Sequence, residues 1–130
     1  MNIIKMAIMV YLLLMVVLTG CSLVQQDRIK NFIPGVYVRY YADEYTESYD
    51  TIRITRSSGP GKENYSVIKR RRTAKVDNNG KIVPGYELKK WTATFDAKSQ
   101  SLWITNAGKA IYFYPARREL RIGTEPYKKL

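Results

Sequence analysis

YDTIRITR, residues 49–56, gives the clearest indication of the fold class of this 130-residue chain. Ile52 and Ile54 alternate in it with Thr51 and Arg53. Successive side chains of a β-strand point to opposite faces, so this period of two separates an apolar face from a polar one. β-branched residues also fit a pleated, half-buried surface. The stretch therefore predicts a β-strand with one buried face.

The same alternation recurs through the rest of the chain. Trp91, Ala93 and Phe95 fall on one face of a strand, with lysine and threonine residues on the other. Turn sequences separate such segments, among them Ser57–Lys62 and Asp77–Gly80, which ends in the hairpin dipeptide Asn-Gly. We expect strands at Gly35–Tyr41, Tyr49–Arg56, Asn64–Val76, Tyr86–Phe95, Gln100–Thr105, Lys109–Tyr114 and Arg118–Ile122.

Short connections and the lack of a long helical pattern between the strands favour an antiparallel arrangement. An open sheet would leave exposed edges, which closure into a barrel removes. The sequence therefore predicts an all-β domain. We expect an antiparallel meander of about seven strands that forms a small barrel or half-barrel, behind a cleaved N-terminal signal helix.

The N-terminus has the three parts of a secretory signal: Lys5, the 13-residue apolar run Met6–Leu18, and small residues before Cys21. Leu-Thr-Gly-Cys at 18–21 is typical of a bacterial lipoprotein signal, which predicts cleavage between Gly20 and Cys21 and lipidation of the Cys21 thiol. A permanent membrane helix is an alternative, but the run is shorter than the roughly 20 residues that span a bilayer. A plain secretory signal is another, and it would leave an odd free thiol in an oxidising compartment.

These features divide the chain into a signal, a tether and one domain. We predict a lipoprotein signal peptide at residues 1–20, a lipidated tether at 21–34 and a β-domain at 35–130. Two or more acyl chains hold a protein stably at a membrane. Ser22 follows the cysteine where aspartate would favour retention in the inner membrane, and no acidic run follows to direct export to the cell surface. We therefore expect a lipid-anchored protein of the outer membrane that faces the periplasm.

The composition restricts the chemistry of the mature chain. It contains no histidine, and its one cysteine is assigned to lipid. A zinc site, a Ser-His pair and a thiol nucleophile are therefore excluded. We expect no catalytic residues, no cofactor and no metal; catalysis by carboxylates or by lysine and tyrosine side chains is the alternative that this composition leaves open. Once Lys5 is removed with the signal, 21 basic and 11 acidic residues leave a net charge of +10, which favours an acidic protein partner or another polyanion.

The basic residues are densest at Lys69, Arg70, Arg71, Arg72 and Lys75, which are the candidates for binding an anionic partner. On a strand, Arg70 and Arg72 point to one face, whereas Lys69, Arg71 and Lys75 point to the other. At least one of these rows must lie on the surface. The alternative role is protection of a sheet edge, where charged side chains deter pairing with other chains. An extracytoplasmic location argues against nucleic acid as the partner.

Two further groups have both a structural and a functional interpretation. Four acidic residues between the first two strands supply the kind of oxygen ligands that calcium takes, but they lack the spacing and glycine of a calcium loop. A solvated loop is favoured for them: Asp43, Glu44, Glu47 and Asp50. Aromatic residues could line a ligand cavity, but core packing is favoured in a domain of about 110 residues. That cavity would be lined by Tyr37, Trp91, Trp103 and Phe113.

Three short motifs resemble those of a group of small lipoproteins from Bacteroidota. They are Pro-Gly-x-Tyr-Val-Arg-Tyr at 34–40, Lys-x-Trp-Thr-Ala-x-x-Asp at 89–96 and Gly-Lys-x-Ile-x-Phe at 108–113. The resemblance runs through most of the mature chain and brings no catalytic residues. It implies an association with conjugative elements, near whose genes some members of the group occur. The strand pattern also loosely resembles lipocalin-like small barrels, at the level of fold alone.

Together these features predict a membrane-tethered envelope lipoprotein with a structural or protein-interaction role. The lipid on Cys21 engages the membrane, and the basic face recruits an acidic protein partner or another polyanion. The alternative is a small-barrel lipoprotein that binds an apolar or anionic molecule. A lined cavity would favour this alternative, whereas a filled core would favour the interaction role.

Overall fold

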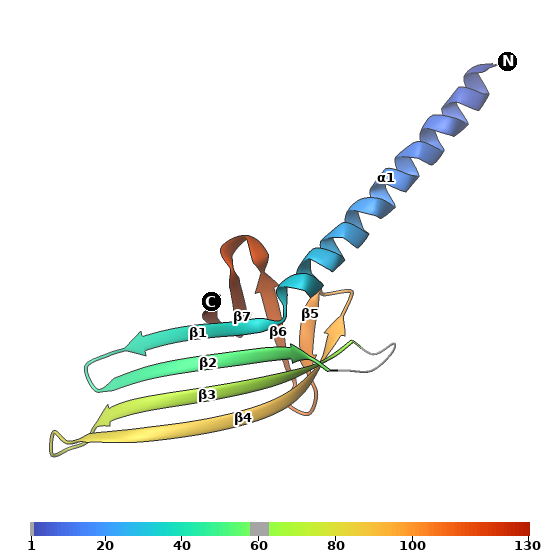
Figure 1. Ribbon diagram of the computed structural model, residues 1–130. Helices are drawn as coiled ribbons and strands as arrows, with labels where there is room; N and C mark the ends of the chain where they lie inside the picture. The colour runs from blue at the N-terminus through green and yellow to red at the C-terminus, as the bar shows by residue number, and fades with distance from the viewer. Residues whose placement is uncertain (1, 58–62) are drawn as a thin grey trace.

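The structure, a computed structural model, describes residues 2–57 and 63–130, and side chains at all of these except 18–27. One long helix leads into eight antiparallel strands that close into a barrel in chain order (Figure 1). The helix α1 spans Asn2–Phe32, and a short 3-10 turn, η1, spans Pro115–Arg117. The strands are β1 (Gly35–Ala42), β2 (Thr46–Arg56), β3 (Asn64–Val76), β4 (Ile82–Asp96), β5 (Ser101–Ile104), β6 (Lys109–Tyr114), β7 (Glu119–Ile122) and β8 (Glu125–Lys129).

The predicted fold class is confirmed: the domain is all-β, antiparallel and closed. The predicted strands correspond to β1–β7, and β3 and β6 have the predicted bounds. The structure adds β8, which pairs with β7 and with β1 and so closes the barrel. This strand is hidden in the sequence because Pro126 and two lysines surround Tyr127, its one large apolar residue, which is fully buried.

Turn chemistry joins β3 to β4 where the sequence indicates. The Asp77 carboxylate accepts hydrogen bonds from the backbone N–H groups of Asn79, at 2.9 Å, and Lys81, at 2.8 Å. Gly80 has a φ of +75°, a left-handed conformation that glycine adopts without steric cost. The turn predicted at Asp77–Gly80 is thereby confirmed. The one predicted at 57–62 falls largely on residues 58–62, which lie outside the described residues.

Side chains fill the barrel at the end where α1 joins it. Ile29 and Ile33 lie in this core, so the predicted tether continues as helix to Phe32 and packs against the domain. The Tyr37 hydroxyl lies 2.9 Å from the carbonyl oxygens of Phe32 and Ile33, and the Lys129 ammonium donates to the Phe32 carbonyl at 2.5 Å. These bonds satisfy carbonyl groups that a helix end leaves without partners. The domain boundaries at 20/21 and 34/35 stay predictions. Besides Ile33 and Tyr37, the apolar core residues that are at most 1% exposed are Ile52, Ile54, Tyr65, Val67, Ala93, Leu102, Ile104, Ile111, Leu120 and Tyr127.

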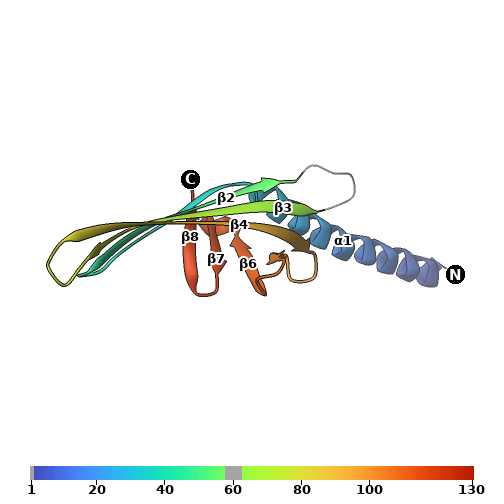
Figure 2. The ribbon, with the colours of Figure 1, turned by 90° about the horizontal axis from the view of Figure 1, so that it is seen from below.

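Strands β1–β4 run on past the shorter strands β5–β8 (Figures 1 and 2). β8 pairs with β1 at Tyr37 and Val38, and β5 pairs with β4 from Ala93 onward. Beyond these points, residues 39–50 and 70–88 form a four-stranded sheet, which we call the sheet extension. The sheet extension points away from α1 in both views. All five predicted anion-binding residues lie on β3, in or beside this extension.

Candidate functional site

The inward-facing side chains change from apolar to charged along three strands. On β3, Tyr65 and Val67 are buried in the core, and Lys69 and Arg71 continue the same face toward the sheet extension. Two other strands make the same change: from Ile54 and Ile52 to Asp50 on β2, and from Ala93 and Trp91 to Lys89 and Glu87 on β4. The point of change is the mouth of the barrel, where the sheet extension begins.

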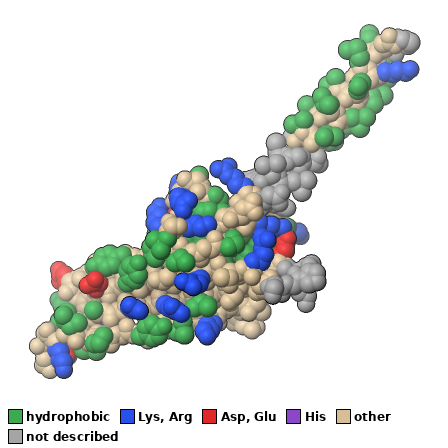
Figure 3. Space-filling view, in the orientation of Figure 1, with side chains coloured by type: hydrophobic (Ala, Val, Ile, Leu, Met, Phe, Trp, Pro, Cys, Tyr) green, Lys and Arg blue, Asp and Glu red, His purple; other side chains and the backbone are tan. Residues whose placement is uncertain are grey.

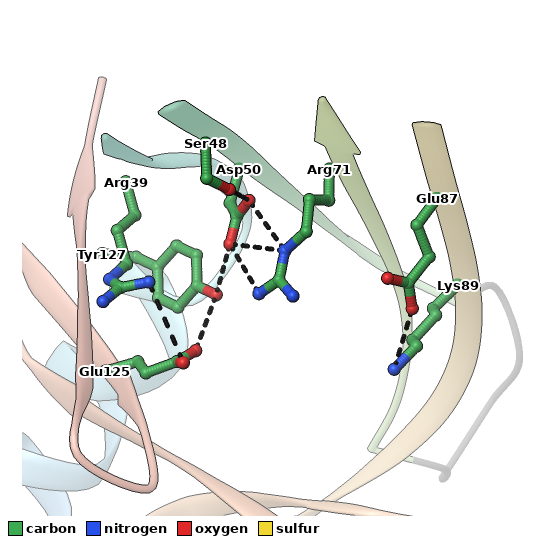
Figure 4. Close-up of polar contacts among 8 residues, drawn as sticks. All are labelled: Arg39, Ser48, Asp50, Arg71, Glu87, Lys89, Glu125 and Tyr127. Carbon is green, nitrogen blue, oxygen red and sulfur yellow. Dashed lines mark hydrogen bonds and ion pairs between the residues drawn. The ribbon is translucent and has the colours of Figure 1, made fainter. Parts of the chain in front are cut away.

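The register brings four charged residues side by side at this mouth. Arg39 pairs with Asp50, Asp50 pairs with Arg71, and Arg71 pairs with Glu87. Residues directly opposite each other on neighbouring strands have side chains on the same face. These four residues, the charged row, therefore alternate in sign across β1–β4. Figure 4 shows their side chains on the inner side of the strands, with Tyr127 and Glu125 of β8 facing Arg39 and Asp50.

Asp50 lies at the centre of the charged row and is only 1% exposed (Figure 4). Arg71 donates to its two carboxylate oxygens, with Nε 3.0 Å from Oδ1 and Nη2 2.9 Å from Oδ2. The hydroxyl groups of Ser48 and Tyr127 also donate to Asp50, at 2.9 and 3.4 Å. Burial disfavours the carboxylate charge, but the bonds from Arg71 and Ser48 outweigh it and hold the pKa of Asp50 below its ordinary value.

The rest of the charged row is also paired. Glu125 lies 3.8 Å from Arg39 Nη1 and accepts from the Tyr127 hydroxyl at 3.3 Å, and Lys89 Nζ lies 3.0 Å from Glu87. Within the described residues, every buried side-chain nitrogen and oxygen has a hydrogen-bond partner. An aspartate that is ionised and this fully bonded is suited to hold strands in register, not to transfer protons.

Two open grooves flank the charged row. One, of about 750 Å³, runs along the inner face of the sheet extension between Tyr41 and Lys75. The other, of about 720 Å³, lies at the barrel mouth; we call it the mouth groove, and Lys69, Lys89, Trp91 and Trp103 line it. Arg71 and Glu125 contribute to both grooves. The inner surface is therefore packed near α1 and hollow at the opposite end.

The cavity considered from sequence does not form as one unit. Tyr37 and Phe113 lie in the core, with ring centroids 6.2 Å apart, so core packing is confirmed for these two residues. Trp91 and Trp103 instead line the mouth groove, where Trp103 is 51% exposed. The four aromatic residues thus belong to two different parts of the barrel.

The outer face of the sheet extension exposes tyrosine beside arginine. Tyr40, Tyr49, Arg72 and Tyr86 are successive partners across β1–β4, and the three tyrosines are 47–62% exposed. Arg70 and Leu88 pair with each other two residues along, on the same face. We call these six residues the tyrosine face. Lys and Arg side chains and hydrophobic side chains gather over the β1–β4 sheet in Figure 3.

The predicted division of the basic stretch between two faces is confirmed. Arg70 and Arg72 are exposed on the outer face, whereas Lys69 and Arg71 are partly buried on the inner one, which Lys75 continues along the extension. The structure thus separates the five candidates into an outer pair and an inner group. Their role in binding an anionic partner stays a prediction.

The four acidic residues do not form a single loop. Asp43 is in the turn after β1, where its carboxylate accepts from the backbone N–H groups of Tyr45 and Thr46 at 2.9 and 2.7 Å. Asp50 is instead buried in β2, so placing it in a solvated loop was wrong. Its even-numbered position, shared with Ile52 and Ile54, was the signal that could have identified it as an inward-facing charge.

The predicted anchor lies in α1, where the backbone is helical through Gly20 and Cys21 but their side chains are outside the described residues. Cleavage and lipidation there stay predictions. None of the helices in the described part of the chain is both long enough and apolar enough to cross a bilayer.

Comparison with protein-family models, curated proteins and solved structures finds no match to this chain.

Proposed function

We propose that this protein is a lipid-anchored lipoprotein of the outer membrane that faces the periplasm. It acts without catalysis, as an interaction module that holds an acidic protein partner in an envelope assembly. A conjugative transfer machine is the assembly implied by the resemblance to Bacteroidota lipoproteins. The anchor rests on the Leu-Thr-Gly-Cys sequence at 18–21. The interaction role rests on the tyrosine face.

The tyrosine face has the composition of a protein interface. Tyrosine and arginine are enriched at interfaces because they combine a large apolar area with hydrogen-bond donors. Tyr49 and Tyr86, at 47% and 62% exposed, flank Arg72 in one row across the sheet. Arg70 and Arg72 form no ion pair within the described residues, so their charge is available to an acidic surface.

The position of this face supports the same proposal. The sheet extension points away from α1, which carries the proposed lipid site (Figures 1 and 2). A lipid on Cys21 would hold the α1 end of the protein at the membrane. The tyrosine face would then stand clear of the lipid headgroups, within reach of a partner.

The anchor is tested by replacing Cys21 with serine in native cells. We expect C21S to lose incorporation of an alkyne-labelled fatty acid, and Ser22→Ala, the matched control, to keep it. The mature protein should begin at Cys21, as checked by mass spectrometry. Labelling of C21S at the level of the unchanged chain would contradict lipidation at this thiol.

The interaction role is tested with a photo-reactive phenylalanine analogue placed in intact membranes. Probes at Tyr49 and Tyr86 should crosslink one defined protein. A probe at Tyr114, which is 41% exposed on β6, is the matched control and should not. Arg70→Glu with Arg72→Glu should abolish the crosslink, since reversed charges repel an acidic partner. Crosslinks that are equal at all three sites, or absent from all, would refute the proposal.

A further inference from the structure

The mouth groove contains a pair of lysines that the interaction role does not use. Lys69 of β3 and Lys89 of β4 are directly opposite each other in the register and both line this groove. Like charges at directly opposite positions destabilise a pair of strands. Repulsion between the two ammonium groups lowers the stability of this strand pair. An anion bound between them would remove that repulsion.

Lys69 is the unpaired member of this pair. Lys89 Nζ forms an ion pair with Glu87 at 3.0 Å. Arg71, two residues along β3 from Lys69, donates a hydrogen bond to Asp50. Lys69 has no carboxylate within ion-pair distance among the described residues, and its Nζ lies 6.0 Å from the centroid of the Tyr127 ring. Burial and then the Arg71 charge lower the pKa of Lys69, against the opposing effects of Asp50 and Glu125. Its positive charge is therefore under-compensated in the free protein.

The wall beside the two lysines is aromatic. Trp91 is partly buried on the inner face of β4, and Trp103 of the neighbouring strand β5 also lines the groove. Lys109 adds a third lysine to the lining, and Arg71 and Glu125 also contribute charge. The rest of the lining is uncharged: Gly108, Ala110, Tyr112, Ile122, Gly123 and Thr124. A groove of about 720 Å³ is in the size range of small-molecule sites, which combine apolar walls with a few placed polar groups.

We propose that the mouth groove binds a small organic anion, whose phosphate or carboxylate group lies between Lys69 and Lys89 and whose ring packs against Trp91. The inner lysines supply charge-assisted hydrogen bonds, and the indole supplies a flat apolar surface. This site lies on the opposite side of the sheet from the tyrosine face. Anion binding in the mouth groove can therefore be tested independently of the proposed protein interaction.

Both tryptophans of the chain line this groove, so their fluorescence reports on it selectively. The full chain, held in a non-ionic detergent, is titrated with phenyl phosphate, benzoate, inorganic phosphate and phenol. We expect saturable changes in tryptophan emission with phenyl phosphate or benzoate, confirmed by calorimetry. Phenol, which lacks the charge, and inorganic phosphate, which lacks the ring, should each bind at least about tenfold more weakly.

Neighbouring residues on the two faces of one strand provide matched variants. Lys69→Gln should weaken binding about tenfold, whereas Arg70→Gln, one residue along and outward-facing, should leave it unchanged. Lys89→Gln and its outward neighbour Lys90→Gln form a second pair that does not depend on the folding of the first. We also expect K69Q to unfold at an equal or higher temperature, because it removes an unpaired charge.

Each outcome decides for or against the site. If phenol binds as tightly as phenyl phosphate, the lysines do not contribute to binding. If inorganic phosphate binds as tightly as phenyl phosphate, Trp91 does not contribute. The proposal is overturned if neither organic anion binds saturably at millimolar concentration. It is also overturned if Arg70→Gln and Lys69→Gln weaken binding equally.

Discussion

The two ends of the barrel are built from the same strands and differ in what those strands place inside. Near α1 the inner positions hold Tyr65, Val67 and Ile54, all at most 1% exposed. Toward the sheet extension the same face carries Asp50 and Arg71, beside open grooves. The alternation along each strand determines which side chains point inward. Whether these side chains are shielded from water depends on how many strands of the barrel lie opposite them. Where β5–β8 end, the inner face borders open grooves, and its buried charge is tolerated because it is paired, as Asp50 is with Arg71.

The largest loss of stability is expected from a cavity in the packed end of the barrel. Tyr37→Ala should lower the free energy of unfolding by about 3–5 kcal/mol, since it removes a fully buried ring and the hydroxyl that joins Phe32 to the barrel. Urea unfolding of the full chain measures it. Tyr40→Ala, three residues along β1 and 61% exposed, is the control and should leave the midpoint unchanged. Equal losses in both variants would contradict the division into a packed and an open end.

The next effect tests the polar link between the two ends. Asp50→Asn should lower the free energy of unfolding by about 2–3 kcal/mol, less than the roughly 3–5 kcal/mol for breaking a fully buried ion pair, because the Arg71 side chain is 32% exposed. Arg71→Met should recover part of this loss when combined with it, because no unpaired charge then remains. An additive double variant would show that the two side chains are not coupled.

The same pair predicts the acid sensitivity of the fold. The pKa of Asp50 is lower in the folded chain than the ordinary aspartate value of about 3.9. The ion pair therefore stabilises the fold fully above that value, and its contribution is lost as the pH falls through the lower folded-state pKa. We expect the drop in unfolding temperature between pH 5 and pH 2 to be smaller in D50N. An unchanged drop would contradict the assignment.

A smaller effect separates the barrel from the sheet extension. Gly123, between β7 and β8, and Gly80, at the tip of the extension, have φ values of +61° and +75°. Alanine at either position costs about 1 kcal/mol of local strain. We expect Gly123→Ala to lower global stability by that amount. Gly80→Ala should mainly speed amide hydrogen exchange near residues 74–84, because the tip can open while the barrel stays closed. Equal global losses would show that the extension and barrel unfold as one unit.

The smallest effect on stability is expected on the tyrosine face. Arg70→Gln with Arg72→Gln should not change the unfolding midpoint, since both side chains are exposed. With a short DNA duplex as a generic polyanion, the slope of log binding constant against log salt should fall by about 2. Lys98→Gln with Arg117→Gln, two exposed charges on the short-stranded side, is the control. An equal fall in the control would assign the binding to net charge alone.

Most of the fold follows from patterns within single segments. The alternation in Tyr49–Arg56 and the Asn-Gly turn before β4 predict strands and a hairpin because both signals are local. β8 could not be predicted in this way, because Tyr127 is the one large apolar residue on its inward face. Its role in closing the barrel comes from pairing with β1, whose partner residues lie 90 and 92 positions away in the sequence.

The candidate site is divided in the same way. The alternation of the basic stretch separates Arg70 and Arg72 from Lys69 and Arg71 in the sequence itself, and the structure confirms it. No local pattern shows that Arg71 faces Asp50 or that Lys69 faces Lys89, because each pair joins different strands. Register depends on turn lengths and on the whole core, so these pairs become visible only in the folded chain.

The sequence alone predicts an all-β meander and the two faces of each long strand, and its Leu-Thr-Gly-Cys pattern predicts an anchor at Cys21. These are statements about neighbours along the chain, which periodicity and short motifs record. Three features appear only in the assembled fold: β8 closes the barrel, β1–β4 extend past β5–β8, and the inner face changes from packed to charged at Asp50. The reason is physical: burial depends on which distant segments cover a side chain, and that is a property of the assembled sheet.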